Sequence, residues 1–133
     1  MLIKQRRITI VKISRPQHSI NEELQWFGNS LELFNLRDKD RSCFRIFIEL
    51  LKATKRQAPI SSDELAQKLD LSRGTVVHHL NKLIESGIVI IVKNKYILRG
   101  NNLQELVEEI EADSLRTLSE LKKVAKSIDE GMG

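Results

Sequence analysis

Residues 61–89, SSDELAQKLDLSRGTVVHHLNKLIESGIV, constrain the fold most, because they hold two helix-start signals close together. Ser61 and Glu64 stand in capping-box register, in which the serine accepts the amide proton of the glutamate and the glutamate reaches back. The helix that begins there breaks at Asp70, and Ser72 is placed to cap the next helix. The sequence therefore predicts two short helices joined by a tight turn.

The second of these helices has two faces of different chemistry. At about 100° per residue, Val76, Leu80 and Leu83 share one face, with His79 at its edge. The opposite side carries Gly74, His78 and Asn81, flanked by Thr75, Val77 and Lys82. One face is expected to pack into a core, and the other to remain available for a partner.

A β-hairpin is predicted directly after this helix. Gly87 is a suitable residue for the end of the helix, and the segment IVIIVKNKYILRG has β-branched residues on both sides of Lys93-Asn94-Lys95. The hairpin should therefore have a basic tip.

Two further helices are predicted before this segment, and a strand at the start of the chain. The segment NEELQWFGNSLELF, from Asn21, has cap and apolar residues at roughly helical spacing. The segment DKDRSCFRIFIELLKATKR offers Asp38 or Asp40 as a cap, followed by a regular apolar stripe. Near the N-terminus, Ile8 to Ile13 (ITIVKI) suits a strand, which could pack on the domain or belong to a free basic arm.

The order of three helices and a hairpin over residues 40–99 resembles the winged helix-turn-helix transcription regulators of archaea and bacteria, chiefly the ArsR and MarR families. The similarity lies in LSRGTVVHHLNKLIESGIV, with its serine cap, Thr-Val, His-Leu, Leu, and a glycine followed by an aliphatic residue. It covers about 60 residues of the chain. The resemblance implies that the chain binds duplex DNA sequence-specifically.

A mainly α fold with a small β-hairpin (α+β) is therefore expected, a winged helix-turn-helix with a long C-terminal helix. We expect three parts. Residues 1–37 form a basic strand and helix extension, residues 38–100 the DNA-binding domain, and residues 101–133 a long dimerisation helix.

The DNA-binding residues follow from the way an α-helix enters the major groove, where polar groups, methyls and cations near its N-terminal end read base edges. Helix termini and short hydroxyls can hold phosphate, and a glycine lets the backbone approach closely. The wing lysines, with Arg99 nearby, would contact phosphates or the minor groove. The predicted set is Ser72, Arg73, Gly74, Thr75, Val77, His78, Asn81, Lys82, Lys93 and Lys95.

Charge is distributed unevenly along the chain, although the formal net charge is only +4. Residues 1–20 carry five basic and no acidic groups, whereas residues 101–133 carry eight acidic and four basic groups. A polyanion such as nucleic acid would be attracted to the basic start and middle and repelled by the tail. Charge alone is equally compatible with an ordinary solvated surface.

A long amphipathic helix is predicted from Asn102 onward. It would project roughly 40 Å at 1.5 Å per residue, further than a domain of this size can cover. We therefore expect a homodimer that presents two recognition helices to DNA, with packing onto Trp26 and Phe27 of the same chain as the alternative. The predicted dimerisation face comprises Leu103, Val107, Ile110, Leu118, Leu121, Ala125 and Ile128.

Catalysis and metal binding are not expected. His78 and His79 project about 100° apart, which does not suit two ligands of one metal ion. The single cysteine, Cys43, lies in an apolar run with no paired base, so packing is its expected role. We expect no enzyme activity, no cofactor, no metal, no membrane span and a reducing cytoplasmic location.

Two other functions remain open. The chain could be a winged-helix module that contacts protein in a larger transcription or repair assembly. It could also be a repressor that responds to a small ligand or to redox state through Cys43 or a pocket near Trp26.

Overall fold

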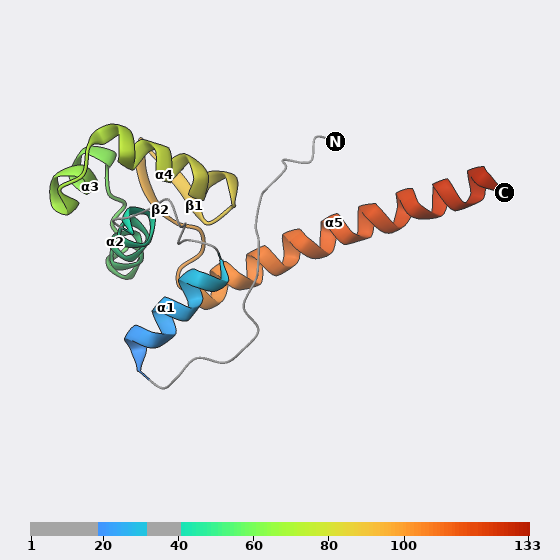
Figure 1. Ribbon diagram of the computed structural model, residues 1–133, viewed down its shortest axis with the longest axis horizontal. Helices are drawn as coiled ribbons and strands as arrows, with labels where there is room; N and C mark the ends of the chain where they lie inside the picture. Colours follow the sequence, from blue (N-terminus) through green and yellow to red (C-terminus); the bar gives the residue numbers. More distant parts are fainter. Residues whose placement is uncertain (1–18, 32–40) are drawn as a thin grey trace.

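The computed structural model describes residues 19–31 and 41–133 (Figure 1). The predicted strand at Ile8 to Ile13 and the last residues of the first predicted helix lie outside these ranges. In chain order the elements are α1 (Ile20–Ser30), α2 (Ser42–Arg56), α3 (Ser62–Leu69), α4 (Arg73–Glu85), β1 (Val89–Val92), β2 (Lys95–Leu98) and α5 (Leu103–Met132). The predicted α+β class, with a hairpin and a long C-terminal helix, is confirmed.

The globular part is built around α2, which contacts α3, α4 and β2 (Figure 1). One hydrophobic core joins these elements to the first turns of α5. Its fully buried side chains include Ile46, Phe47, Leu50, Leu65, Val76, Leu80, Leu83, Ile88, Leu98 and Leu106. The ring of Phe27 on α1 stacks against Phe47 with centroids 6.0 Å apart, which attaches α1 to this core.

Both predicted serine caps of the central helices are confirmed. Ser61 Oγ accepts the amide proton of Glu64 at 3.1 Å and donates to the Glu64 carboxylate at 3.2 Å. Ser72 Oγ likewise accepts the amide proton of Thr75 at 3.1 Å. The two helix starts therefore depend on local hydrogen bonds within four residues of sequence.

The first two helices begin at other residues than predicted. α1 begins at Ile20, with Ser19 rather than Asn21 as its cap. α2 begins at Ser42, and Arg41, rather than an aspartate, occupies the cap position in a left-handed conformation. The Arg41 side chain instead donates to Gln25 Oε1 at 2.6 Å, so this residue links α1 to α2 across the sequence.

The turn between α3 and α4 is closed by backbone hydrogen bonds. Asp70 adopts a left-handed conformation at φ 55°, and the Leu71 amide donates to the Ala66 carbonyl at 2.9 Å. α4 ends in the same way, with Gly87 at φ 77° and the Ile88 amide bonded to Leu83. These are Schellman ends, in which a left-handed residue turns the chain and satisfies the last carbonyls.

The hairpin has a two-residue turn, because Val92 pairs with Lys95 and both Lys93 and Asn94 have positive φ. Lys95 therefore belongs to strand β2, and the turn itself consists of Lys93 and Asn94. Ile60, just before α3, adds an antiparallel bridge to Tyr96, with N–H to O distances of 2.9 and 2.7 Å in the two directions. This bridge anchors the wing to the helix-turn-helix.

The long helix α5 divides into two parts. Its first turns pack on the domain, where Leu106 and Ile110 are buried and Leu103 is half-buried against the core. From residue 115 onward nearly all side chains are exposed, and the helix extends away from the globular part (Figure 1). The predicted dimerisation face is divided accordingly: Leu103 and Ile110 belong to the core of their own chain, whereas Val107, Leu118, Leu121, Ala125 and Ile128 are exposed.

None of the described helices combines the length and apolar character needed to cross a lipid bilayer.

Candidate nucleic-acid interface

The two faces of α4 lie as the spacing predicts. Val76, Leu80 and Leu83 are buried against the core. On the opposite side Arg73, Gly74, His78, Asn81 and Lys82 are exposed, and Thr75 and Val77 are half-buried. The helix therefore presents a mainly polar face, with Val77 as an apolar member, that begins at its N-terminus. The cations, amides and hydroxyls of this face suit the contact edges of bases.

The N-terminus of α4 combines a capping hydroxyl with open backbone. Ser72 Oγ donates to Thr75 Oγ1 at 2.8 Å, so these two hydroxyls hold each other in place. A Cβ added at Gly74 would meet no atom within 4 Å. The protein itself has room for a side chain there, so a requirement for glycine would have to come from a bound partner.

Arg73, the first residue of α4, is exposed and forms an ion pair with α3. Its Nε lies 3.6 Å from Asp63 Oδ1 on the first turn of α3. Both side chains are about three-quarters exposed, so water and salt screen the pair strongly. Arg73 can therefore exchange this carboxylate for a phosphate at little cost.

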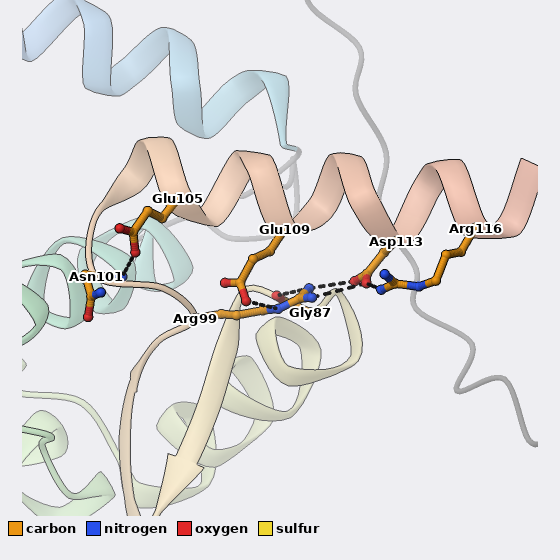
Figure 2. A network of polar contacts seen from close by, with 7 residues as sticks. All are labelled: Gly87, Arg99, Asn101, Glu105, Glu109, Asp113 and Arg116. Carbon is orange, nitrogen blue, oxygen red and sulfur yellow. Dashed lines mark hydrogen bonds and ion pairs between the residues drawn. The ribbon is translucent and has the colours of Figure 1, made fainter.

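The wing lysines and Arg99 have different environments. Lys93 and Lys95 are exposed at the end of the hairpin, where they can meet a DNA backbone. Arg99 is only 14% exposed, and its guanidinium is bound to Asp113 of α5 (Figure 2). The expectation that Arg99 helps the wing to contact DNA is therefore corrected, because its charge is already neutralised within the chain.

The adjacent histidines differ in exposure. His78 is exposed on the outer face, whereas His79 is half-buried at its edge, and their rings meet edge to face at 5.4 Å. Within residues 19–31 and 41–133, no group of three or more His, Cys, Asp and Glu side chains is placed to hold a metal ion.

A buried carboxylate ties α3 to α2. Glu49 is nearly buried, with Lys52 Nζ at 3.3 Å and Lys68 Nζ at 3.2 Å from its two oxygens. Burial raises the pKa of Glu49, but the ion pairs with Lys68 and Lys52 outweigh this and hold the pKa below its usual value. The Arg45 guanidinium also donates to the Leu69 carbonyl at 2.6 Å, so α2 holds the C-terminal end of the short helix α3 at two neighbouring points.

Sequence reasoning missed several residues that shape this region. Leu106 is fully buried although the predicted face contained its neighbour Val107, and its spacing to Leu103 and Ile110 was the available signal. The local sequence carries no signal for the Arg99–Asp113 pair. The two residues lie in different parts of the chain, and their contact depends on the direction of α5.

One of the comparisons with known proteins gave a match. Residues 40–92 match a family model described as a helix-turn-helix domain. Neither the curated proteins nor the solved structures gave a match. The match supports a DNA-binding helix-turn-helix protein, and it ends at the last residue of β1. Together with the β1–β2 hairpin, the matched segment has the architecture of a winged helix-turn-helix domain.

Proposed function

We propose that the protein is a sequence-specific, double-stranded-DNA-binding transcription regulator that acts as a homodimer. The observation that carries the proposal is the exposed polar face of α4 beside the basic wing. Arg73, His78 and Asn81 are exposed and would meet base edges, while Lys93 and Lys95 would supply the phosphate contacts that add affinity without sequence preference. The kinship with ArsR- and MarR-type regulators belongs to the same proposal.

Dimer formation is proposed through the exposed part of α5. Leu118, Leu121 and Ile128 are each more than half exposed on one face of this helix. Exposed aliphatic side chains at helical spacing favour a second helix as a cover, and an identical chain supplies a matching face. Two-fold symmetry would then present two copies of α4 to successive major grooves.

The experiment is selection of the full-length protein on random duplex DNA, followed by sequencing of the recovered sites. The proposal expects a defined motif repeated as an inverted pair, because a two-fold dimer reads two equivalent half-sites. Recovery of unrelated sequences would rule out base readout, and a single motif without symmetry would rule out the dimer on DNA.

A winged-helix module that binds protein is the second candidate, and one observation favours it. Ile90, Ile91 and Val92 on β1 are exposed, which places aliphatic surface on the wing beside its lysines. Exposed apolar patches often mark protein contacts. This function predicts DNA binding that is weak and salt-labile, with no motif in the selection.

A ligand- or redox-responsive repressor is the third candidate. Cys43 is buried near the start of α2, so an oxidant would reach its sulfur only after local opening. Equal DNA binding before and after peroxide treatment would argue against a redox role of this residue.

A further inference from the structure

Arg99 joins the wing to α5 through a paired hydrogen bond (Figure 2). It directly follows β2, and its Nη1 and Nη2 donate to Asp113 Oδ2 at 2.6 Å and Asp113 Oδ1 at 3.1 Å. A guanidinium that meets both oxygens of one carboxylate fixes orientation as well as distance. Arg116, one turn further along α5, also donates to Asp113.

The same guanidinium reaches two further elements. Its Nε lies 3.7 Å from Glu109 Oε1, one turn earlier on α5, and its Nη1 lies 3.5 Å from the Gly87 carbonyl just after α4. The Arg99 amide also donates to the Ile88 carbonyl at 2.9 Å. One residue therefore connects the end of the recognition helix, the base of the wing and two turns of α5.

Solvent weakens this contact less than it weakens the other ion pairs of α5. The side chains of Arg99 and Asp113 are 14% and 23% exposed, whereas those of Lys123 and Glu120 are 71% and 45% exposed. The hydrogen bond to Asp113 raises the pKa of Arg99 despite its burial. The pair is thus placed to hold a defined geometry.

The chain between the wing and α5 also has little freedom. Gly100 has φ +83°, and a Cβ there would lie 3.1 Å from Leu106 N and 3.1 Å from Glu105 Cβ. Asn102 Oδ1 accepts the Glu105 amide at 2.8 Å, and the Glu105 carboxylate accepts the Asn101 amide at 2.8 Å. This short, capped link brings α5 into the domain in one direction.

Small changes in that direction have large effects at the far end of the helix. From Asp113 to Met132, α5 spans about 28 Å at 1.5 Å per residue. A rotation of about 10° at Asp113 would therefore move the C-terminal end by about 5 Å. This displacement exceeds the rise of about 3.4 Å per DNA base pair.

We propose that Arg99 and Asp113 are positioning residues that fix the direction of α5 relative to α4, and thereby the spacing between the two DNA half-sites that the homodimer accepts. The part that concerns spacing rests on the proposed function. The part that concerns direction is a property of the single chain and is tested without DNA.

The direction is measured by electron–electron distance spectroscopy on the full chain with Cys43→Ala. Spin labels are attached at Glu85→Cys, at the end of α4, and at Lys126→Cys on α5, and labelled chains are diluted with an excess of unlabelled chain. The distance distribution should be narrow with Arg99 present and should widen in Arg99→Gln. Lys123→Gln, which removes one positive charge from an exposed pair on the same helix, should leave it narrow.

Asp113→Asn provides a second variant of the same contact, in case Arg99→Gln fails to unfold cooperatively on heating. It keeps the side-chain shape but removes the charge that Arg99 binds. A broad distance distribution in the parent, the spin-labelled chain that keeps both Arg99 and Asp113, would overturn the proposal. So would distributions as narrow as the parent in both Arg99→Gln and Asp113→Asn.

Spacing is then tested with duplexes that carry two copies of the selected half-site, separated by spacers that differ by single base pairs. The parent and Lys123→Gln should prefer one spacer by about tenfold over its neighbours, and Arg99→Gln should reduce this preference to about twofold, with single half-site affinity unchanged. An unchanged spacer profile in a variant with a widened distribution would overturn the role in spacing. If no motif is recovered in the selection, the proposed function fails, while the distances still decide the role in direction.

Discussion

The helices α4 and α5 differ in how much of their apolar face is buried. This difference distinguishes the exposed polar surface of α4 from the exposed apolar surface of α5. α4 covers its apolar face completely and exposes a polar one. α5 covers its apolar face only in its first turns, and beyond Asp113 its leucines are exposed. A helix such as α4, with its apolar face buried, is stable within its own chain and can recognise a polar ligand. The exposed apolar face of a helix such as α5 favours a protein partner.

The strongest test compares one leucine from each helix. Leu80→Ala on α4 should lower the free energy of unfolding by about 2–5 kcal/mol, because its side chain is fully buried. Leu121→Ala on α5 should lower it by less than about 1 kcal/mol at concentrations where the chain is monomeric. Urea unfolding curves measure both. Equal losses would show that α5 is packed more tightly than its exposure indicates.

A charge on the exposed face of α5 should remove the dimer. Leu121→Glu places a carboxylate in the proposed helix pair, and we expect a monomer in sedimentation velocity at tens of micromolar, with weaker binding to a two-site duplex. Ser119→Glu is the matched control, because residue 119 lies on the opposite side of the helix. A monomeric parent protein at this concentration would end the dimer model.

Substitutions on α4 and on the wing should have separable effects on DNA. His78→Ala or Asn81→Ala should cost about 1–3 kcal/mol of discrimination at one base position. Lys93→Ala should weaken binding to all sequences alike and flatten the salt dependence. Competition binding with cognate and random duplexes measures this. Equal losses on both duplexes for every variant would remove the claim of base readout.

A smaller effect is expected at Gly74, where one substitution should raise stability but weaken DNA binding. Gly74→Ala should raise the free energy of unfolding by up to about 1 kcal/mol, because alanine loses less backbone entropy in a helix and meets no neighbour here. The same change should weaken DNA binding if the backbone approaches DNA at this point. Thermal unfolding and binding titrations give the two readings, and unchanged affinity would show that no close approach occurs.

The smallest effect concerns the ion pairs of Glu49, whose two lysines are about half exposed. Because the folded-state pKa of Glu49 lies below its usual 4.5, the ionised form stabilises the fold above that pH, and this stability is lost as pH falls through the folded-state pKa. Glu49→Gln should therefore be less stable than the parent at neutral pH, and the difference should shrink below pH 4.5. Urea unfolding across this range checks the sign, and a difference independent of pH would contradict it.

Features that depend on neighbouring residues could be predicted from the sequence. The caps at Ser61 and Ser72, the buried stripe of α4 and the hairpin all follow from contacts within a few positions along the chain. The predicted start of α2 was wrong: Arg41 takes the cap position, and its side chain donates to Gln25 of another helix, a contact that the local sequence does not indicate. The residues proposed to contact DNA remain predictions, although the structure places Arg73, His78 and Asn81 on one exposed face.

The sequence by itself determined the helix-turn-helix and its wing, because caps, glycine ends and residue periodicity act locally. Only the tertiary structure decided at which residue α5 ceases to pack against the globular domain. Leu103 and Val107 both carry apolar side chains at helical spacing, but the first lies against the core and the second is exposed. Tertiary packing likewise decided that the Arg99 side chain binds Asp113 of α5 and not DNA beside the wing. This contact requires α5 to leave the domain in one particular direction.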